Sequence, residues 1–305
     1  MTKLHIVGTG AIGTLIAAGA EKHGVAYARY PKSRSAIPET FHWNDNDIVS
    51  LSSSASTPTC LRQDDVIVFP LKVHQLEQAL ITWAPFLENR PPVVLLHNGL
   101  GGYEIATSIL GESYPMLLAT TSHAALKEPK GSSVTYTGIG KTQIGLPRRG
   151  DMSKNGRYPR WVQQTTALLN KALPPFDFVE DITRALWLKL AINCVINPLT
   201  ALNDMRNKGV LLNEYNEIRH ALCQEFALVA EQYDLVFSAL ELEKHVLNVA
   251  SLTGQNYSSM HQDIAMHRHT EIDAINGYIV SLANKKGISV PTHALMVDRV
   301  KGLAL

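Results

Sequence analysis

A short apolar run followed by three spaced glycines lies near the start of the chain and restricts its fold more than any other feature. Leu4–Val7 has the pattern of a buried strand, and a helical pattern runs on to about Lys22. The residues that join them are Gly8, Thr9, Gly10, Ala11, Ile12 and Gly13. In such a turn the first glycine permits the tight bend, the second lets backbone approach a pyrophosphate, and the third lets the helix pack on the strand. The helix N-terminus attracts phosphates, so we expect residues 8–13 to bind a dinucleotide.

The turn after the second expected strand, at about Val25–Tyr30, indicates which dinucleotide is bound. Sites specific for NAD place an acidic residue there to bind the ribose hydroxyls, but this chain has no acid between Glu21 and Glu39. Three basic residues occupy the stretch instead: Arg29, Lys32 and Arg34. Because cations suit a 2′-phosphate, we expect NADP(H), with the phosphate ligand left open among the three. A solvated basic turn is the alternative.

Strand and helix patterns continue to alternate along the chain. Asp65–Leu71 and Pro91–His97 have the composition of buried strands, and a helical pattern at about Leu76–Leu87 links them. This order predicts a doubly wound parallel sheet, in which ligands bind beyond the carboxyl ends of the strands. Lys72 and Asn98 each follow one of these strands, so we expect both to face the cofactor. Either could instead cap a loop.

Further strand patterns lead to the middle of the chain. Residues 41–63 are polar and rich in Ser and Thr, which indicates an irregular or short-stranded connection, and Pro115–Thr121 has the pattern of another strand. Ser133–Thr137 and Lys141–Gly145 alternate polar and apolar residues around a Gly-Ile-Gly sequence. We expect these two segments to pair as an antiparallel hairpin.

Strand patterns stop near residue 180. Residues 147–160 have the composition of a surface loop, and a helical pattern at Trp161–Ala172 and a short strand at Phe176–Val179 follow it. From Ile182 onward the pattern is helical nearly throughout. We therefore expect an α/β Rossmann N-terminal domain, residues 1–180, followed by an all-α C-terminal domain, residues 181–305.

One apolar helical segment, Ala185–Leu202, carries three polar residues at strict four-residue spacing: Lys189, Asn193 and Asn197. Each such step turns the side chain by only about 40°, so the three form one stripe. Burying an ammonium and two amides is costly unless polar groups lie against them. The stripe therefore either satisfies itself within a core or lines a cleft and binds a polar ligand. These residues and Pro198 make a poor membrane span, and we expect Pro198 to kink or end the helix.

A second polar cluster lies in the last quarter of the chain. Ser259 with Gln262 matches a capping box, which makes Ser259 a candidate helix N-cap. Asp263, His267 and Glu271 follow at four-residue spacing, as on one face of a helix. We expect Glu271, two turns into that helix, to reach a substrate pocket.

Charge and cysteine content argue against several other classes. The chain has 305 residues and a net charge of +1, which gives no broad electrostatic case for nucleic acid or an anionic membrane. Its three cysteines are far apart, and the spacing of His261, His267 and His269 does not place all three on one helix face. We therefore expect neither a disulfide framework nor a metal site. The strand and glycine turn at the start leave no room for a signal peptide, so we expect a cytoplasmic protein.

Together these motifs resemble the ketopantoate reductase (2-dehydropantoate 2-reductase) family. The resemblance covers essentially the whole chain, and its last two blocks are very specific. Besides the glycine turn, the matching blocks are Leu71–Gln75, His97–Gly99, Thr121–Ala125, Trp187–Thr200, Ser258–Asp263 and Arg268–Gly277. The resemblance implies a reduction of the C2 ketone of ketopantoate by NADPH, a step of pantothenate synthesis.

The resemblance also implies a role for each matching residue. Lys189 would be the proton donor, and Glu271 would orient the ketone oxygen or the lysine. The implied substrate-binding residues are Asn98, Asn193, Asn197, Asn207, Asn256 and Ser259. The implied cofactor-binding residues are those of the glycine turn with Lys32, Lys72, Asn98, Ala125 and Glu271. Partial desolvation of Lys189 would lower its pKa from about 10.4 toward neutrality.

The chain departs from the family pattern in three places. Pro31, beside Lys32 and between the flanking arginines, leaves the 2′-phosphate ligand open. Ala201–Asn207 diverges, which affects the assignment of Asn207. Residues 147–160 match poorly, as a family-variable loop would.

Three interpretations of the function follow from the sequence. The first is a ketopantoate reductase, the second a related NADP-dependent 2-keto-acid reductase with another side-chain specificity, and the third a non-enzymatic NADP(H)-binding sensor. A sensor would not need Lys189 and Glu271 together, so their joint presence favours an enzyme. We expect a small-molecule 2-keto acid as the partner, and a monomer or a homodimer.

Overall fold

The computed structural model describes residues 2–32, 37–44, 47–52, 55, 61–128, 132–147 and 158–303. Arg34 and most of the loop expected at residues 147–160 lie outside these ranges. The chain forms two compact units. The first contains Met1–His97 and Gly102–Thr183, and the second contains Asn98–Gly101 and Arg184–Leu305.

A seven-stranded sheet organises the first unit, and its order is β11-β10-β7-β6-β5-β1-β2. The strands are β1 (Leu4–Val7), β2 (Tyr27–Tyr30), β5 (Val66–Phe69), β6 (Val93–Leu96), β7 (Met116–Thr121), β10 (Thr142–Gly145) and β11 (Phe176–Phe178). The five strands from β2 to β7 pair in parallel. Every residue of β1, β2, β5 and β6 is buried, as parallel strands covered on both faces require. The sheet is the doubly wound one that the sequence predicts.

Two pairs of helices pack against this sheet. The pairs are α1 (Ala11–Lys22) with α4 (Arg160–Ala172), and α2 (Val73–Trp83) with α3 (Gly102–Leu110). Val66 and Val68 of β5 belong to one core with α1 and α4. Phe69 points to the other face, where its ring meets Trp83 of α2 at 6.0 Å between centroids. Because successive strand residues point to opposite faces, the two helix pairs cover opposite sides of the sheet.

A second, four-stranded sheet of the same unit has the order β4-β3-β9-β8. Its strands are β3 (Thr40–His42), β4 (Ile48–Ser50), β8 (Ala124–Lys127) and β9 (Ser133–Gly138). The expected hairpin is wrong, because β9 pairs with β3 and β8 while β10 pairs with β7 and β11. Between them the chain crosses to the end of β7, where Lys141 N–H donates to Ser122 Oγ at 3.0 Å. Alternation predicted both strands but could not specify their partners.

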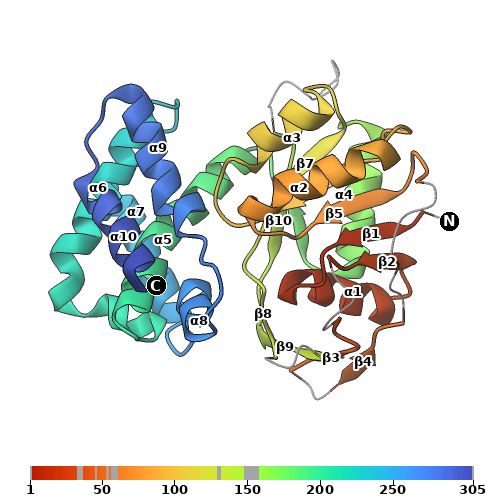
Figure 1. The fold of residues 1–305 in the computed structure, drawn as a ribbon, viewed down its shortest axis with the longest axis horizontal. Helices are drawn as coiled ribbons and strands as arrows, with labels where there is room; N and C mark the ends of the chain where they lie inside the picture. The colour runs from red at the N-terminus through yellow and green to blue at the C-terminus, as the bar shows by residue number, and fades with distance from the viewer. Residues whose placement is uncertain are drawn as a thin grey trace. The chain divides into compact units, whose positions relative to one another are not determined.

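The second unit is helical, and α5 (Ile182–Leu202) lies among its other helices (Figure 1). Those helices are α6 (Asn216–Glu231), α7 (Ala239–Leu252), α8 (Ser259–Ala265), α9 (Asn276–Lys286) and α10 (Pro291–Leu303). Short 3-10 helices span Asn207–Leu211, Asn213–Tyr215 and Ile272–Ala274. Within the described residues, α5 alone is long and apolar enough to cross a membrane, but 67% of its apolar window is buried. The helix is therefore a core helix, and the two units follow the expected order of an α/β part and an all-α part.

Candidate active site

Two glycines of the turn in the first unit, Gly8 and Gly13, occupy positions where a side chain would not fit. Gly8 has φ +118°, in the region that favours glycine, and a Cβ atom there would lie 2.6 Å from Leu71 Cδ2. A Cβ atom on Gly13 would overlap the Gly8 carbonyl oxygen. The turn also packs on the segment just before Lys72, since a Gly13 Cβ would be 3.2 Å from Pro70 Cγ.

Gly10 differs from these two glycines. Its φ of −70° and ψ of −177° are extended backbone that any residue adopts, and a Cβ atom there would meet nothing within 4 Å. Packing within the protein therefore does not require glycine at this position. Gly10 is the N-cap of α1 and supplies no side-chain cap to it. An open, uncapped helix N-terminus next to a glycine fits a pyrophosphate.

The basic residues after β2 differ in their surroundings. Arg29 is 2% exposed, and its guanidinium donates to the carbonyl oxygens of Pro38 at 2.6 Å and Leu51 at 3.3 Å. The Lys32 side chain is exposed. Since Arg29 holds two neighbouring segments, its availability to a 2′-phosphate is reduced, and among the described residues Lys32 stays the predicted ligand.

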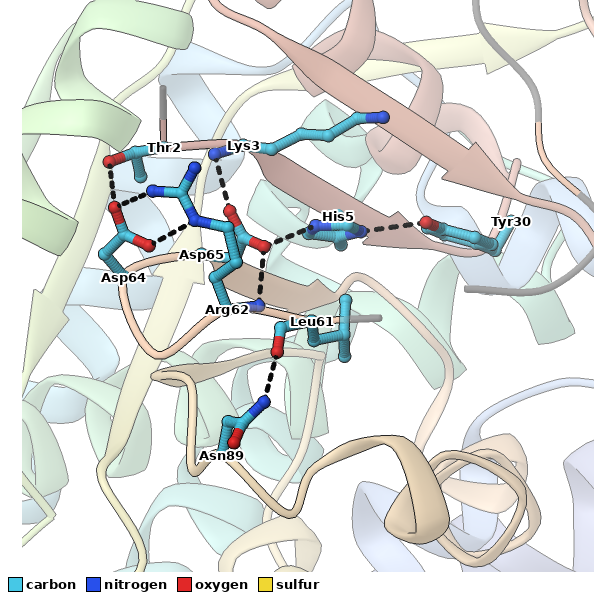
Figure 2. A network of polar contacts seen from close by, with 9 residues as sticks. All are labelled: Thr2, Lys3, His5, Tyr30, Leu61, Arg62, Asp64, Asp65 and Asn89. Carbon is cyan, nitrogen blue, oxygen red and sulfur yellow. Dashed lines mark hydrogen bonds and ion pairs between the residues drawn. The ribbon is translucent and has the colours of Figure 1, made fainter. Parts of the chain in front are cut away.

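A buried polar network supports the strands that carry these residues (Figure 2). The Asp65 carboxylate accepts the backbone N–H groups of Lys3 and Arg62, each at 2.9 Å, and lies 3.4 Å from His5 Nε2. The other ring nitrogen of His5 lies 2.8 Å from the Tyr30 hydroxyl. Burial lowers the pKa of His5 and raises the pKa of Tyr30 to about 12. Both groups are therefore neutral at pH 7, and the network ties β1, β2 and the start of β5 together.

The polar stripe of the second unit lies on one continuous helix. Lys189 and Asn193 are partly buried, and Asn197 is buried. Pro198 was expected to kink or end this helix. An end there is wrong, because α5 continues to Leu202, and the kink stays a prediction.

Pro198 is accommodated by a side chain from a different helix. Proline has no N–H, so the Cys194 carbonyl oxygen lacks its usual helical donor. Asn276 Nδ2 donates to that oxygen at 3.0 Å and lies 3.2 Å from His293 Nδ1. His293 Nε2 then lies 3.1 Å from the Leu222 carbonyl oxygen. This fully buried network supports α5 at the level of the stripe. Reading from the sequence missed Asn276, although a proline inside a helix signals the need for such a donor.

Three predicted site residues come together in the second unit. Asn98 Nδ2 donates to Glu271 Oε2 at 3.3 Å, and the Glu271 carboxylate interacts electrostatically with Lys189. Gly99, with φ +80°, packs so closely on the Ala274 carbonyl that a Cβ atom would overlap it. Burial lowers the pKa of Lys189 to about 8, although the negative charge of Glu271 opposes the decrease.

Glu271 reaches this position by a path that differs from the expected one. The helix α8 ends at Ala265, so Glu271 does not lie two turns into it but directly precedes the 3-10 helix Ile272–Ala274. Arg268 N–H donates to the Asp263 carbonyl at 2.7 Å, and Arg268 Nε lies 3.0 Å from the Asp263 carboxylate. These contacts turn the chain after α8, which helical spacing alone did not reveal.

Asn207 and Asn256, two of the expected substrate amides, lie on neighbouring segments. Asn207 N–H donates to the Asn256 carbonyl oxygen at 2.9 Å. The Asn207 side chain is buried and donates to Thr253 Oγ1 at 2.9 Å, whereas the Asn256 side chain is exposed. The structure therefore gives Asn207 an anchoring contact and leaves Asn256 accessible.

Ser259 is the first residue of α8 and is exposed. The candidate N-cap role assigned to it is wrong, because Ser258 caps the helix by accepting the His261 N–H at 3.1 Å. Ser258 Oγ also lies 2.7 Å from Thr200 Oγ1, near the end of α5. The sequence alone does not show which of the two adjacent serines caps the helix. In the structure Ser258 is buried and Ser259 is exposed.

Comparison with known proteins matches both parts of the chain to one family. The sequence model described as Ketopantoate reductase PanE/ApbA matches residues 4–149, and the one described as Ketopantoate reductase PanE/ApbA C terminal matches residues 181–304. The 2-dehydropantoate 2-reductase of Escherichia coli O157:H7 is 35% identical over 304 residues, which cover 98% of this chain and 94% of that protein.

Two solved structures share the fold over nearly the full length. D-mandelate dehydrogenase with NADH and anilino(oxo)acetate has a TM-score of 0.88 at 20% identity, with 99% of this chain and 98% of that chain covered. The dimeric ketopantoate reductase from Staphylococcus aureus has a TM-score of 0.80 at 21% identity, with 99% and 98% covered. The resemblance seen in the sequence is confirmed, and the chain belongs to the ketopantoate reductase family.

Proposed function

We propose that this chain catalyses the NADPH-dependent reduction of 2-dehydropantoate to pantoate, a step of pantothenate and coenzyme A synthesis. The observation that carries the proposal is the partly buried Lys189 beside the Glu271 carboxylate, on a helix with a stripe of amides. Membership of the family supplies the substrate class. Residues 1–180 are the proposed NADP-binding domain, and residues 181–305 the proposed substrate and catalytic domain.

The residues present fit the cofactor at the glycine turn, where Gly10 leaves the N-terminus of α1 open. Bound NADPH supplies a hydride to the ketone carbon. The groups proposed to hold it are the glycine turn, Lys32, Lys72, Asn98, Ala125 and Glu271. Lys72 precedes α2 with extended backbone, and Ala125 lies in β8. The exposed Lys32 and the absence of an acid after β2 support NADPH over NADH.

Lys189 is the proposed proton donor to the oxygen of the reduced ketone. A pKa of about 8 keeps most of the lysine protonated at pH 7. It also makes the ammonium a better acid than an ordinary lysine, because a general acid works best with a pKa near the working pH. Burial thus lowers the pKa of Lys189, while the negative charge of Glu271 limits the decrease.

The remaining polar groups are proposed to hold the substrate. Glu271 is fixed by the amide of Asn98, so it can orient the lysine or the ketone oxygen. Asn193 and Asn197 would bind the keto acid from α5, and Asn207, Asn256 and Ser259 from the segments beside α8. Hydroxyl and amide groups suit the carboxylate and hydroxyl of the substrate.

The proposed partner is a small-molecule 2-keto acid, and the proposed location is the cytoplasm. The dimeric relative from Staphylococcus aureus supports a homodimer as one of the two assemblies to test, with a monomer as the other.

Measuring NADPH oxidation with ketopantoate and a panel of other branched 2-keto acids tests the proposal. We expect the highest kcat/KM with ketopantoate, and at least a tenfold preference for NADPH over NADH, since a charged hydrogen bond to the 2′-phosphate contributes about 1.5–3 kcal/mol. A higher kcat/KM with another keto acid would favour the related reductase. NADPH binding without any turnover would favour the sensor.

A further inference from the structure

Two segments of the helical unit, residues 204–208 and residues 254–261, are joined along their backbones. Asn207 N–H donates to the Asn256 carbonyl oxygen at 2.9 Å, and Lys208 N–H donates to the Gly254 carbonyl oxygen at 3.2 Å. The Arg206 guanidinium donates to the Gln255 carbonyl oxygen between them. The first segment overlaps Ala201–Asn207, the stretch that departs from the family pattern in the sequence.

Contacts between four side chains also join the same two segments. Asp204 Oδ1 lies 2.7 Å from His261 Nε2. The His261 ring stacks on Tyr257, with centroids 4.3 Å apart and planes at 17°. The Arg206 guanidinium carbon lies 4.7 Å from the centre of the Tyr257 ring. Asp204 and Arg206 are two residues apart, so these contacts join the two segments at two points. We call the four side chains, Asp204, Arg206, Tyr257 and His261, the 204–261 clamp.

The contacts of the two rings contribute most of the stability of this clamp. The Asp204 side chain is 94% exposed, whereas that of His261 is 12% exposed. A contact to a carboxylate that is almost fully in water contributes little, because solvent screens it. Stacking between the imidazole and the phenol, with a guanidinium over the outer ring, removes apolar surface from water and favours one arrangement of the rings.

The clamp is also fixed to α5, the helix that carries Lys189. The His261 N–H donates to Ser258 Oγ at 3.1 Å, and that oxygen lies 2.7 Å from Thr200 Oγ1. Within α5, Thr200 Oγ1 lies 2.7 Å from the Ile196 carbonyl oxygen and 3.1 Å from that of Asn197. The 254–261 segment is therefore held against the end of the polar stripe.

We infer that the 204–261 clamp positions Asn256 and Ser259 for the keto acid. Ser259 lies between Tyr257 and His261, so the stacked rings bracket it, and Asn256 directly adjoins Tyr257. Both side chains are exposed and available to a ligand. Arg206, Tyr257 and His261 are positioning residues that act through these two. The inference rests on the proposed function.

Steady-state kinetics of His261→Ala test the inference. We expect KM for ketopantoate to rise about three- to tenfold, with kcat and KM for NADPH within about twofold of wild type. His261→Phe keeps a ring on Tyr257 and should restore most of the affinity. His245→Ala is the matched control, because His245 is an exposed helical histidine of the same unit, and it should change none of the constants.

A double-mutant cycle tests whether the clamp acts as a unit. Arg206→Ala should raise KM for ketopantoate by a similar factor, and Arg206→Ala/His261→Ala should be no worse than the larger single effect. Fully additive effects would overturn the inference. So would an equal loss of kcat and of NADPH affinity in His261→Ala, because that result indicates a general loss of structure.

Hydrogen exchange separates this inference from the proposed function. In His261→Ala the N–H groups of residues 207 and 208 should exchange faster, while those of α9 keep their wild-type protection. Inactivity of wild type toward every keto acid would refute the proposed function and, with it, the role of the clamp in substrate binding. Faster exchange with an unchanged KM would show that the contacts order the segment without positioning Asn256 and Ser259, which also overturns the inference.

Discussion

The glycine turn and the Lys189 site are built in opposite ways. Six consecutive residues, 8–13, form the turn, and covalent connection alone brings its glycines together. The other site joins Asn98 and Glu271, which are 173 positions apart, to Lys189 on a third segment. Residue spacing determines the geometry of a local site, whereas the geometry of a non-local site depends on how the helices pack. The two sites should therefore respond differently to substitution.

The largest effect is expected at Lys189. Lys189→Met keeps the aliphatic stem and removes a partly buried charge, so the fold and NADPH binding should survive. The kcat should fall by roughly 10²–10⁴, the usual range for loss of a positioned proton donor. The measurement pairs a melting curve with kcat at saturating NADPH.

Lys244→Met provides the control, since Lys244 is exposed on α7 of the same unit and should retain wild-type kcat. A stable Lys189→Met enzyme with near wild-type kcat would remove Lys189 from the mechanism and leave Glu271 as the candidate proton donor.

The second effect concerns the scaffold of the non-local site. His293 is fully buried, and burial lowers its pKa to about 4 from an ordinary 6.5. Between these values the unfolded chain binds a proton that the folded protein does not, so stability should fall as the pH is lowered from 6.5 to 4. The loss attributable to His293 is about 3 kcal/mol.

Chemical unfolding of wild type and His293→Gln at several pH values isolates this contribution. Glutamine can keep the hydrogen bonds to Leu222 and Asn276 but does not titrate, so its unfolding free energy should depend less on pH across this window. Identical pH dependence in the two proteins would show that folding does not lower the pKa of His293.

How far the sequence predicted each region follows from the same contrast. The strand, glycine turn and helix at residues 4–22 could be predicted because the spacing is local and because Gly8 and Gly13 each meet a steric demand. The pairing of β9 and β10 could not, because alternation specifies which face a residue occupies and not which strand lies beside it. Four-residue spacing placed Glu271 on a helix that ends at Ala265. Tertiary contacts of Arg268 with Asp263 overrode that local pattern.

Pro198 illustrates the limit in another way. The sequence predicted that Pro198 would kink or end the helix, but the helix continues, and Asn276 supplies a donor to the carbonyl that Pro198 leaves without one. That donor lies 82 positions from the carbonyl it serves. No spacing rule connects such residues, so the pairing becomes visible only in the fold.

A third, smaller effect separates two glycines of the local site. Gly13→Ala would place a Cβ atom against the Gly8 carbonyl oxygen and should lower the unfolding free energy by about 1–3 kcal/mol. In Gly10→Ala the added Cβ atom meets no protein atom within 4 Å, so the Tm should be unchanged. NADPH should bind at least tenfold more weakly, because the methyl group would obstruct about one charged hydrogen bond to its phosphates. Calorimetric unfolding and NADPH titration of both variants check this. Equal NADPH affinity in Gly10→Ala and wild type would contradict the phosphate assignment.

The smallest effect is a shift in pH dependence within the non-local site. If Lys189 donates the proton, kcat/KM for ketopantoate should fall as the pH rises through about 8, where the lysine loses its charge. The Glu271 carboxylate raises the pKa of Lys189, so Glu271→Gln should move this decline to lower pH besides reducing the rate. Glu217→Gln, at an exposed glutamate of α6, should leave the profile unchanged. A decline at the same pH in Glu271→Gln and wild type would mean that Glu271 does not tune the lysine. The carboxylate would then act only on the substrate or through Asn98, and the coupling that distinguishes this non-local site from the glycine turn would be absent.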